Sequence, residues 1–166
     1  MSSTVDKAWA TLEQLTDPEI PVVTLRELGI LRDVRETAEG IEVVITPTYS
    51  GCPAMGQIED DVRASLERAG IAARVVTRLA PAWTTDWMSD EAKEKLREYG
   101  IAPPHHTPKD VSVVKFVRRA APAEPVACPL CGSTHTVVTS QFGSTACKAL
   151  YKCLHCQEPF DYFKPY

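Results

Sequence analysis

The sequence predicts an α+β protein in which a small α/β domain with a mixed sheet is followed by a C-terminal four-cysteine zinc ribbon. In the first half of the chain, helical and β-branched segments follow in the order helix, strand, strand, helix, strand, which is typical of a small α/β domain. In the second half, four of the six cysteines form two Cys-x-x-Cys pairs. That spacing is typical of one tetrahedral metal site.

The first domain is expected to begin with a helix whose apolar residues recur at helical spacing and which Pro18 ends. Two β-branched segments around Gly40 predict a hairpin. A second helix carries a buried apolar stripe and ends at Gly70, a residue favoured just after a helix. A further strand completes the sheet. The expected elements are a helix over 4–15, strands over 30–36 and 41–46, a helix over 53–69 and a strand over 71–77.

The second half is expected to be more irregular. Residues 81–110 form a tryptophan-rich extension of the first domain that contains a helix over about 90–99, and residues 111–117 predict a last strand. The composition predicts three parts: a domain over 1–120, a proline-containing linker over 121–127 and the zinc ribbon over 128–166. Within the ribbon, strands are expected over 134–140, 149–152 and 160–163.

Composition excludes several classes of function. The chain has 166 residues and a formal net charge of −4, whereas a protein that binds the phosphate backbone usually has a basic surplus. Its longest apolar runs fall short of the roughly 18 residues that span a bilayer. The first residues lack the basic and apolar regions of a secretory signal. We therefore expect a cytoplasmic protein with no nucleic-acid or membrane partner.

The two Cys-x-x-Cys pairs predict a closed structural site in which Cys128, Cys131, Cys153 and Cys156 bind one Zn²⁺ ion. A module this small buries little apolar surface, so the metal would supply part of its folding energy. Iron remains the alternative, because rubredoxin-like sites and four-cysteine clusters use the same spacing. Four free buried thiols are a weaker alternative. His135 and His155 are expected to lie near the site without binding the metal. Cys147 lies outside both pairs and is expected to be a half-buried thiol, with a resolving or exchange ligand as the alternative.

Cys52 stands apart from the other cysteines and precedes Pro53. Proline is favoured at the first position of a helix, so Cys52 is expected at the N-terminal cap of the second helix. There the helix dipole and free N–H groups would stabilise a thiolate. A reactive thiol or transient metal ligand is one interpretation, with Thr48, Ser50 and Gly51 forming a polar pocket. A buried cysteine that acts as a small apolar side chain is the other.

The first domain resembles the small domain shared by SufT-like proteins, cytosolic iron–sulfur targeting factors and some Mrp/ApbC carriers. The resemblance rests on the segments 17–21, 28–31 and 48–53, which read DPEIP, LGIL and TYSGCP. It implies that Cys52 is the functional residue, with Asp17, Glu19 and Thr48 near it, and that iron or an iron–sulfur cluster is held transiently. From the residues alone, Asp17-Pro18 is equally an ordinary turn.

The extension and the tail resemble the D-subunit family of bacterial phenylacetyl-CoA epoxidase systems. The segments that carry this resemblance are 83–87, 100–104, 128–133, 142–151 and 158–163. It implies an accessory factor that helps to mature a metal centre in another subunit, either the di-iron oxygenase or the reductase. A redox-active electron-transfer subunit and a nucleic-acid-binding ribbon are the alternatives, and a homodimer is left open. The aromatic segment at Trp83 and Trp87 is expected to pack under the sheet, and an exposed surface for a client or a dimer partner is the alternative.

The residues favour the accessory role over catalysis. A di-iron oxygenase needs glutamates and Glu-x-x-His sets on bundled helices, and the expected helices carry no such set. The sequence also lacks the glycine fingerprint of dinucleotide-binding proteins and the phosphate-binding loop of nucleotide hydrolases. We therefore expect a protein that is not itself catalytic but belongs to a multisubunit monooxygenase system.

Overall fold

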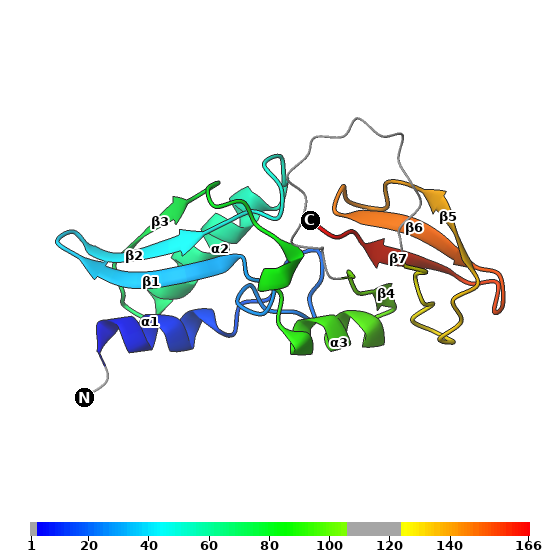
Figure 1. Ribbon diagram of the computed structural model, residues 1–166. Helices are drawn as coiled ribbons and strands as arrows, with labels where there is room; N and C mark the ends of the chain where they lie inside the picture. Colours follow the sequence, from blue (N-terminus) through cyan, green and yellow to red (C-terminus); the bar gives the residue numbers. More distant parts are fainter. Residues whose placement is uncertain (1–2, 106–123) are drawn as a thin grey trace. The chain divides into compact units, whose positions relative to one another are not determined.

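The computed structural model describes residues 3–105 and 124–166, and these divide into two compact units, one up to Ala92 and one from Lys93 (Figure 1). Each unit contains its own sheet. The predicted strand over 111–117 and the first three residues of the predicted linker, 121–123, lie outside the described residues. In the described part of the chain, every helix is too short or too polar to cross a bilayer.

The first unit begins with α1, Thr4–Leu12. Ser3 and Asp6 form a capping box, in which the Ser3 hydroxyl accepts from the Asp6 N–H and the Asp6 carboxylate accepts from the Ser3 N–H. The helix ends earlier than its predicted limit at residue 15, because Leu15 instead joins a loop, where its carbonyl accepts from the Leu25 N–H.

A three-stranded mixed sheet follows, in the order β1-β2-β3. Strands β1, Leu31–Thr37, and β2, Gly40–Ile45, form an antiparallel hairpin, and β3, Ala73–Thr77, lies parallel to β2. The crossover between the parallel strands is α2, Met55–Arg68. These elements confirm the predicted mixed-sheet α/β unit.

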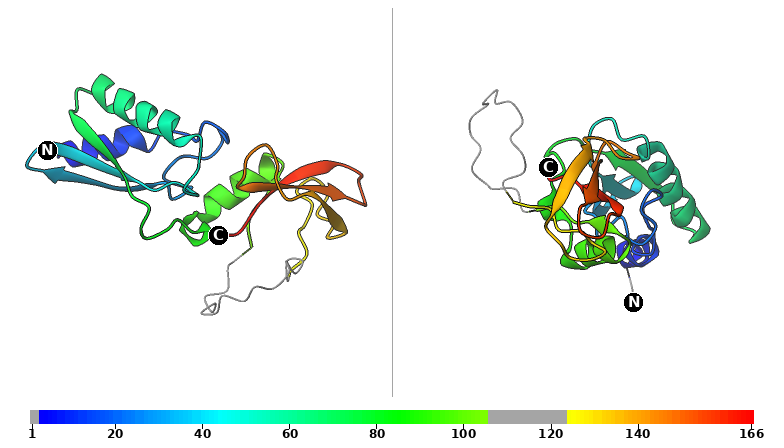
Figure 2. Two further views of the ribbon diagram at one scale, coloured as in Figure 1. Left: turned by 90° about the horizontal axis from the view of Figure 1, so that it is seen from above. Right: turned by 90° about the vertical axis from the view of Figure 1, so that its right-hand side faces the viewer.

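Both helices lie on the same face of this sheet (Figure 2). Ile41, Val43 and Ile45 alternate along β2 and are buried, as is the α2 stripe of Ile58, Val62 and Leu66. At the end of α2, Gly70 has a φ of +72°, and its N–H donates to the Glu67 carbonyl, the type of helix stop expected of glycine. The core of the unit therefore lies between α1, α2 and one sheet face, and neither of these two helices covers the other face.

The tryptophan-containing segment packs onto the first unit. Trp83 is buried, and its indole Nε1–H donates to the Leu28 carbonyl at 2.9 Å. A short 3₁₀ helix, η1 at Thr85–Trp87, follows. Gly29 has a φ of +77°, and a Cβ there would lie 2.8 Å from the Trp87 carbonyl oxygen. Of the two expectations for Trp83, the structure therefore supports packing rather than exposure.

The second unit contains a four-stranded sheet in the order β4-β7-β6-β5. Helix α3, Asp90–Glu98, leads into β4, Ile101–Ala102, which pairs in parallel with β7, Pro159–Phe163. Strands β5, Thr136–Ser140, and β6, Lys148–Cys153, complete an antiparallel meander with β7. These are the three strands that the sequence predicts for the ribbon.

The pairing of β4 gives the second unit more of the chain than residues 128–166. The sequence assigns residues 81–110 to the first domain, whereas Ile101 and Ala102 form hydrogen-bonded pairs with Asp161 and Tyr162. The two residues are buried, Ala102 within the same cluster as Val126 and Tyr162. Burial of this short apolar segment against the ribbon explains the difference, because hydropathy alone does not show which sheet an edge strand joins.

Candidate functional site

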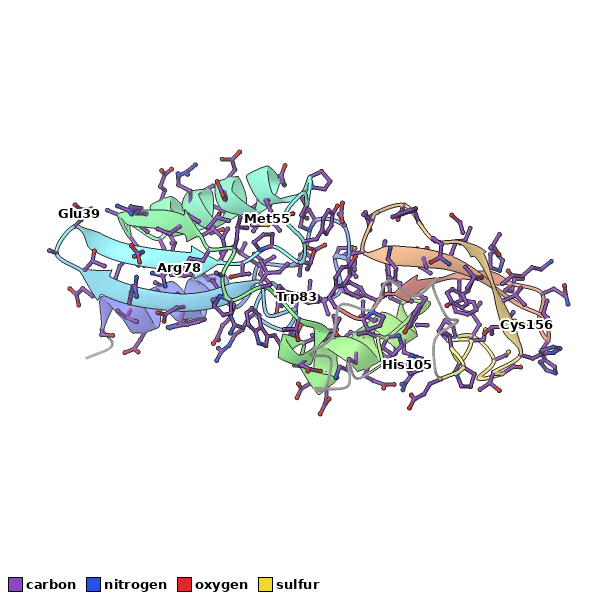
Figure 3. The ribbon with its side chains drawn as sticks, turned by 45° about the horizontal axis from the view of Figure 1, so that its top comes forward. Glu39, Met55, Arg78, Trp83, His105 and Cys156 are labelled. Carbon is purple, nitrogen blue, oxygen red and sulfur yellow. The ribbon has the colours of Figure 1, made fainter. Side chains whose placement is uncertain are left out.

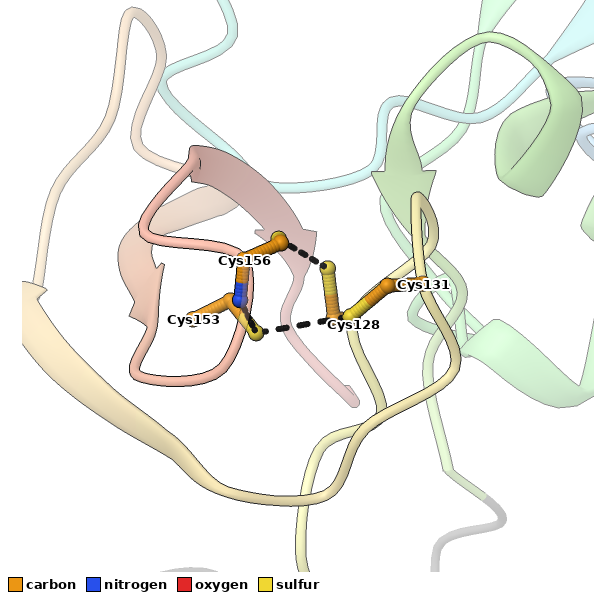
Figure 4. Close-up of side chains that lie close together, drawn as sticks. All are labelled: Cys128, Cys131, Cys153 and Cys156. Atoms are coloured by element: carbon orange, nitrogen blue, oxygen red, sulfur yellow. Dashed lines mark hydrogen bonds between the residues drawn. The ribbon is translucent and has the colours of Figure 1, made fainter.

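The four paired cysteines converge in the second unit, as drawn in Figure 4. Cys128 and Cys131 lie in the turn before β5, Cys153 is the last residue of β6, and Cys156 lies in the turn between β6 and β7. All four sulfur atoms lie within 4.8 Å of one another. The Sγ atoms of Cys128 and Cys156 are 3.8 Å apart, and those of Cys131 and Cys153 are 3.6 Å apart.

These separations fit one tetrahedral ion. A Zn–S bond of about 2.3 Å and the tetrahedral angle require sulfur–sulfur distances of about 3.8 Å. Cys128 and Cys153 are buried next to Tyr151 and Phe160, whereas Cys131 is exposed. The donor set is four thiols, the ligands that zinc prefers in structural sites. Among the described residues, His135 and His155 are exposed and lie outside the cluster.

In each of the two turns, the residue directly after the second cysteine has a left-handed backbone conformation. Gly132 follows the second cysteine of its pair with a φ of +74°, and Gln157 follows the second cysteine of the other pair with a φ of +66°. The Gly132 N–H donates to the Cys128 carbonyl at 2.9 Å, and the Gln157 side-chain amide donates to the Leu154 carbonyl at 2.8 Å. Glycine adopts this conformation readily, whereas only the matching position after Cys156 marks Gln157 as the second such residue.

The thiols differ in acidity. The N–H of Cys156 donates to the Cys153 sulfur at 3.5 Å and is the largest cause that lowers the pKa of Cys153 to about 6. For Cys131, a backbone hydrogen bond from Ser133 lowers the pKa, but burial and the neighbouring thiols together raise it. Several thiolates in so small a volume repel one another, and a bound cation removes that repulsion.

Cys147 is separated from the cluster by the length of β6. It precedes Lys148, the first residue of the strand, whereas Cys153 is the last, so the two cysteines are about 20 Å apart at the rise of an extended strand. Cys147 is buried, and its sulfur lies 3.0 Å from the Thr145 hydroxyl. The distance argues against its role as an exchange ligand for the four-cysteine site.

Cys52 lies in the loop between β2 and α2, where it is half-buried. The expectation that it caps α2 is wrong. Helix α2 begins at Met55, and its cap is Ala54, which makes no side-chain cap hydrogen bond. The Cys52 N–H donates to the Tyr49 carbonyl, and the Cys52 carbonyl accepts from the Met55 N–H. Pro53 therefore lies in a turn before the helix and is not the first residue of the helix. Cys52 lies about one helical turn before the start of α2.

The other residues proposed near Cys52 lie on two loops. Thr48 is half-buried in the Cys52 loop. Asp17 is buried in the loop before β1, and its Oδ1 accepts from the N–H groups of Glu19 and Ile20, both at 2.8 Å. This is the hydrogen bonding of an Asp-initiated turn. Glu19 is exposed.

Both loops lie at one end of the sheet. Leu31, at the start of β1, pairs with Ile45, at the end of β2. The Thr46 N–H, just before the Cys52 loop, donates to the Ile30 carbonyl at 2.8 Å. The carboxyl end of the parallel strands β2 and β3, where α/β folds commonly place their ligands, is therefore the end that carries Cys52.

Two family models match the chain. One, described as an iron-sulfur cluster assembly protein, matches residues 6–77, and the other, described as the PaaD zinc beta ribbon domain, matches residues 114–164. A solved structure from Bacillus anthracis, a domain of unknown function DUF59, is 32% identical and superimposes with a TM-score of 0.51 over 55% of this chain and 90% of its own.

Curated proteins agree with both matches. A Porphyromonas gingivalis protein named Fe-S protein maturation auxiliary factor is 36% identical, over 51% of this chain and 83% of its own length. An Escherichia coli protein, named as the putative D-subunit of 1,2-phenylacetyl-CoA epoxidase, is 48% identical, over 96% of this chain and 92% of its own length. The chain therefore belongs to the D-subunit family of phenylacetyl-CoA epoxidase systems, in which an iron–sulfur cluster assembly domain precedes a PaaD zinc ribbon.

Proposed function

We propose that this protein is an accessory factor that helps to assemble an iron or iron–sulfur centre in another subunit of a phenylacetyl-CoA epoxidase system. The observation that carries the proposal is the joining of an assembly-type domain to a PaaD ribbon, with similarity to an epoxidase D-subunit over 96% of the chain. Relatives of the first unit carry the name Fe-S protein maturation auxiliary factor. In this proposal the protein is cytoplasmic, with the other epoxidase subunits as its partners.

In this proposal the ribbon has a structural role. Cys128, Cys131, Cys153 and Cys156 hold one zinc ion, which supplies folding energy to a unit with a small core. The sulfur–sulfur distances of 3.6 and 3.8 Å support a site whose four positions are all taken by protein ligands. A site filled in this way has no position for a substrate, so the transfer chemistry belongs elsewhere.

Cys52 is the residue that we propose to carry the cargo, iron or a cluster. Its half-buried position in a loop suits a group that must both shield an ion and release it to another protein. Thr48 lies on the same loop. Glu19 is more exposed than Asp17, whose Oδ1 is engaged by two backbone N–H groups. We therefore propose that Glu19 is the acidic residue that assists Cys52, and that Asp17 shapes the loop.

The proposal is tested by the iron content of epoxidase subunits that mature in cells containing the wild type, Cys52→Ala or Cys147→Ala. Cys147→Ala is the matched control, because it also removes a thiol outside the four-cysteine site. With Cys52→Ala, we expect the iron content of the client to fall to the level found without this protein, while the control supports normal loading. Normal iron occupancy in a client matured with Cys52→Ala would contradict the proposal.

A further inference from the structure

The face of the first sheet opposite α1 and α2 ends in a pocket of about 300 Å³. The pocket lies at the carboxyl end of β2 and β3, where Thr46 directly follows β2 and Arg78 directly follows β3. Its lining also includes Arg32, Asp33 and Trp87. Thr46, which is buried, begins the loop that carries Cys52, so the pocket and the candidate transfer residue share one loop. Figure 3 shows Arg78 on this unit, with Glu39 at the tip of the hairpin.

The arginines on this face fall into two kinds. Arg35 forms an ion pair and hydrogen bonds with Glu42, and Arg74 lies 3.5 Å from the Glu39 carboxylate. Arg32, by contrast, lies over the Trp87 ring, with its guanidinium carbon 3.6 Å from the ring centroid. Within residues 3–105 and 124–166, neither Arg32 nor Arg78 forms an ion pair. The pocket is thus flanked by two guanidiniums that form no direct ion pair with a carboxylate of the described residues.

The stacking of Arg32 leaves its donors available. A guanidinium carries five N–H donors in its own plane, and these match the two oxygens of a carboxylate. Contact with the face of Trp87 holds the side chain in place and reduces the conformational entropy that binding would cost. Asp33 offsets part of the positive charge, so the site favours a single carboxylate more than a dense polyanion.

The field of the arginines extends along the face. The hydrogen bond from Arg35 is the largest cause that lowers the pKa of Glu42, and the charges of Arg74 and Arg78 act in the same direction. The whole chain has a formal net charge of −4, so an acidic partner is repelled by much of the remaining surface. Charge complementarity therefore singles out this face for an acidic partner.

We propose that this pocket binds a carboxylate-bearing peptide segment of a partner protein and so docks a client beside the Cys52 loop. Arg32 and Arg78 bind the carboxylate, while Trp87 and Pro81 contact an apolar neighbour of the acidic residue. The identity of the partner as a client rests on the proposed function, whereas binding of the acidic segment does not. Docking here would bring the recipient to the loop from which cargo is released.

The test uses the full chain and two labelled peptides, one that alternates glutamate with leucine and one that alternates glutamine with leucine. Fluorescence anisotropy at low and high salt measures their binding to wild type, to Arg32→Gln/Arg78→Gln and to Arg35→Gln/Arg74→Gln. The last variant is the matched control, because it removes the same charge from arginines of the same sheet that are already paired. All four side chains are exposed, and thermal melts verify that each variant is folded.

We expect the glutamate peptide to bind in a salt-sensitive manner and the glutamine peptide not to bind. The Arg32→Gln/Arg78→Gln variant should weaken binding about tenfold, because two charge-assisted contacts are lost, while the control changes it much less. Equal loss in both variants, equal binding of the two peptides, or tighter binding of a single-stranded oligonucleotide would overturn the proposal.

A further arm separates the two proposals. Cys52→Ala should bind the glutamate peptide as the wild type does, because the thiol is not part of the pocket lining. If Cys52→Ala lowers client iron but the peptide does not bind, docking fails and the proposed function stands. If the peptide binds but Cys52→Ala loads the client with iron normally, the docking proposal stands and the proposed function fails.

Discussion

The turn after Cys131 offers a quantitative test of the ribbon, through the substitution Gly132→Ala. Gly132 has a φ of +74°, in the left-handed region, and a Cβ built on it would meet nothing within 4 Å. The cost is therefore conformational and not steric, about 1–2 kcal/mol for a residue other than glycine. Alanine also reduces the conformational entropy of the unfolded chain, which offsets about 0.5 kcal/mol of this cost. The net destabilisation is about 1 kcal/mol.

Because metal binding and folding are coupled in a small ribbon, this cost should appear in the zinc affinity. A cost of about 1 kcal/mol corresponds to an apparent affinity about fivefold weaker. Competition between the full chain and a chromogenic chelator measures this ratio. Gly56→Ala is the matched control. Gly56 lies within α2 and also has open space around it, so alanine should stabilise the helix and leave zinc binding unchanged.

An unchanged zinc affinity in Gly132→Ala would refute the reasoning, as would an equal loss in Gly56→Ala. The first result would mean that the turn does not need its left-handed residue for the four sulfurs to converge. The second would mean that zinc binding reports on the stability of the first unit instead of the local geometry around Cys131.

Three further predictions concern the two units. Trp83→Phe should destabilise the first unit by about 1–3 kcal/mol in thermal denaturation, because the buried Leu28 carbonyl loses the indole N–H; no change would mean that this contact does not hold the segment. Asp17→Asn keeps the acceptor at Oδ1 and should cost about 1 kcal/mol or less, whereas Asp17→Ala loses both hydrogen bonds and should cost about 2–3 kcal/mol; equal effects would point to the charge. Chelation of zinc should abolish amide-exchange protection in β6 and β7 but not in β2 and α2, and uniform loss would contradict independent units.

The elements of both units follow from local patterns in the sequence. The β-branched segments around Gly40 predict β1 and β2, the apolar stripe with Gly70 predicts α2, and the cysteine spacing predicts the four-sulfur cluster. In each case the signal lies within a few residues of the feature, as side-chain periodicity, a turn residue or ligand spacing. Local physics is enough to specify them.

The features that the sequence did not predict are two local backbone conformations and one pairing between distant residues. The start of α2 at Met55 depends on the turn from Cys52 to Ala54, which proline statistics at helix starts do not resolve. The pairing of Ile101 with Asp161 spans most of the second unit. Gln157 adopts a left-handed backbone conformation that its residue type does not favour, because the turn after Cys156 requires it.

The separation of a structural zinc site from a transfer cysteine is tested most directly by elemental analysis and absorbance spectra of the purified protein. Wild type, Cys52→Ala and Cys128→Ser are measured before and after iron is supplied without oxygen. We expect colourless, zinc-loaded wild type and Cys52→Ala, of which only the wild type then takes up iron, and a Cys128→Ser variant that has lost its zinc. Iron bound by Cys52→Ala as fully as by the wild type, or a coloured wild type whose iron disappears in Cys128→Ser, would contradict this assignment and indicate a redox-active ribbon.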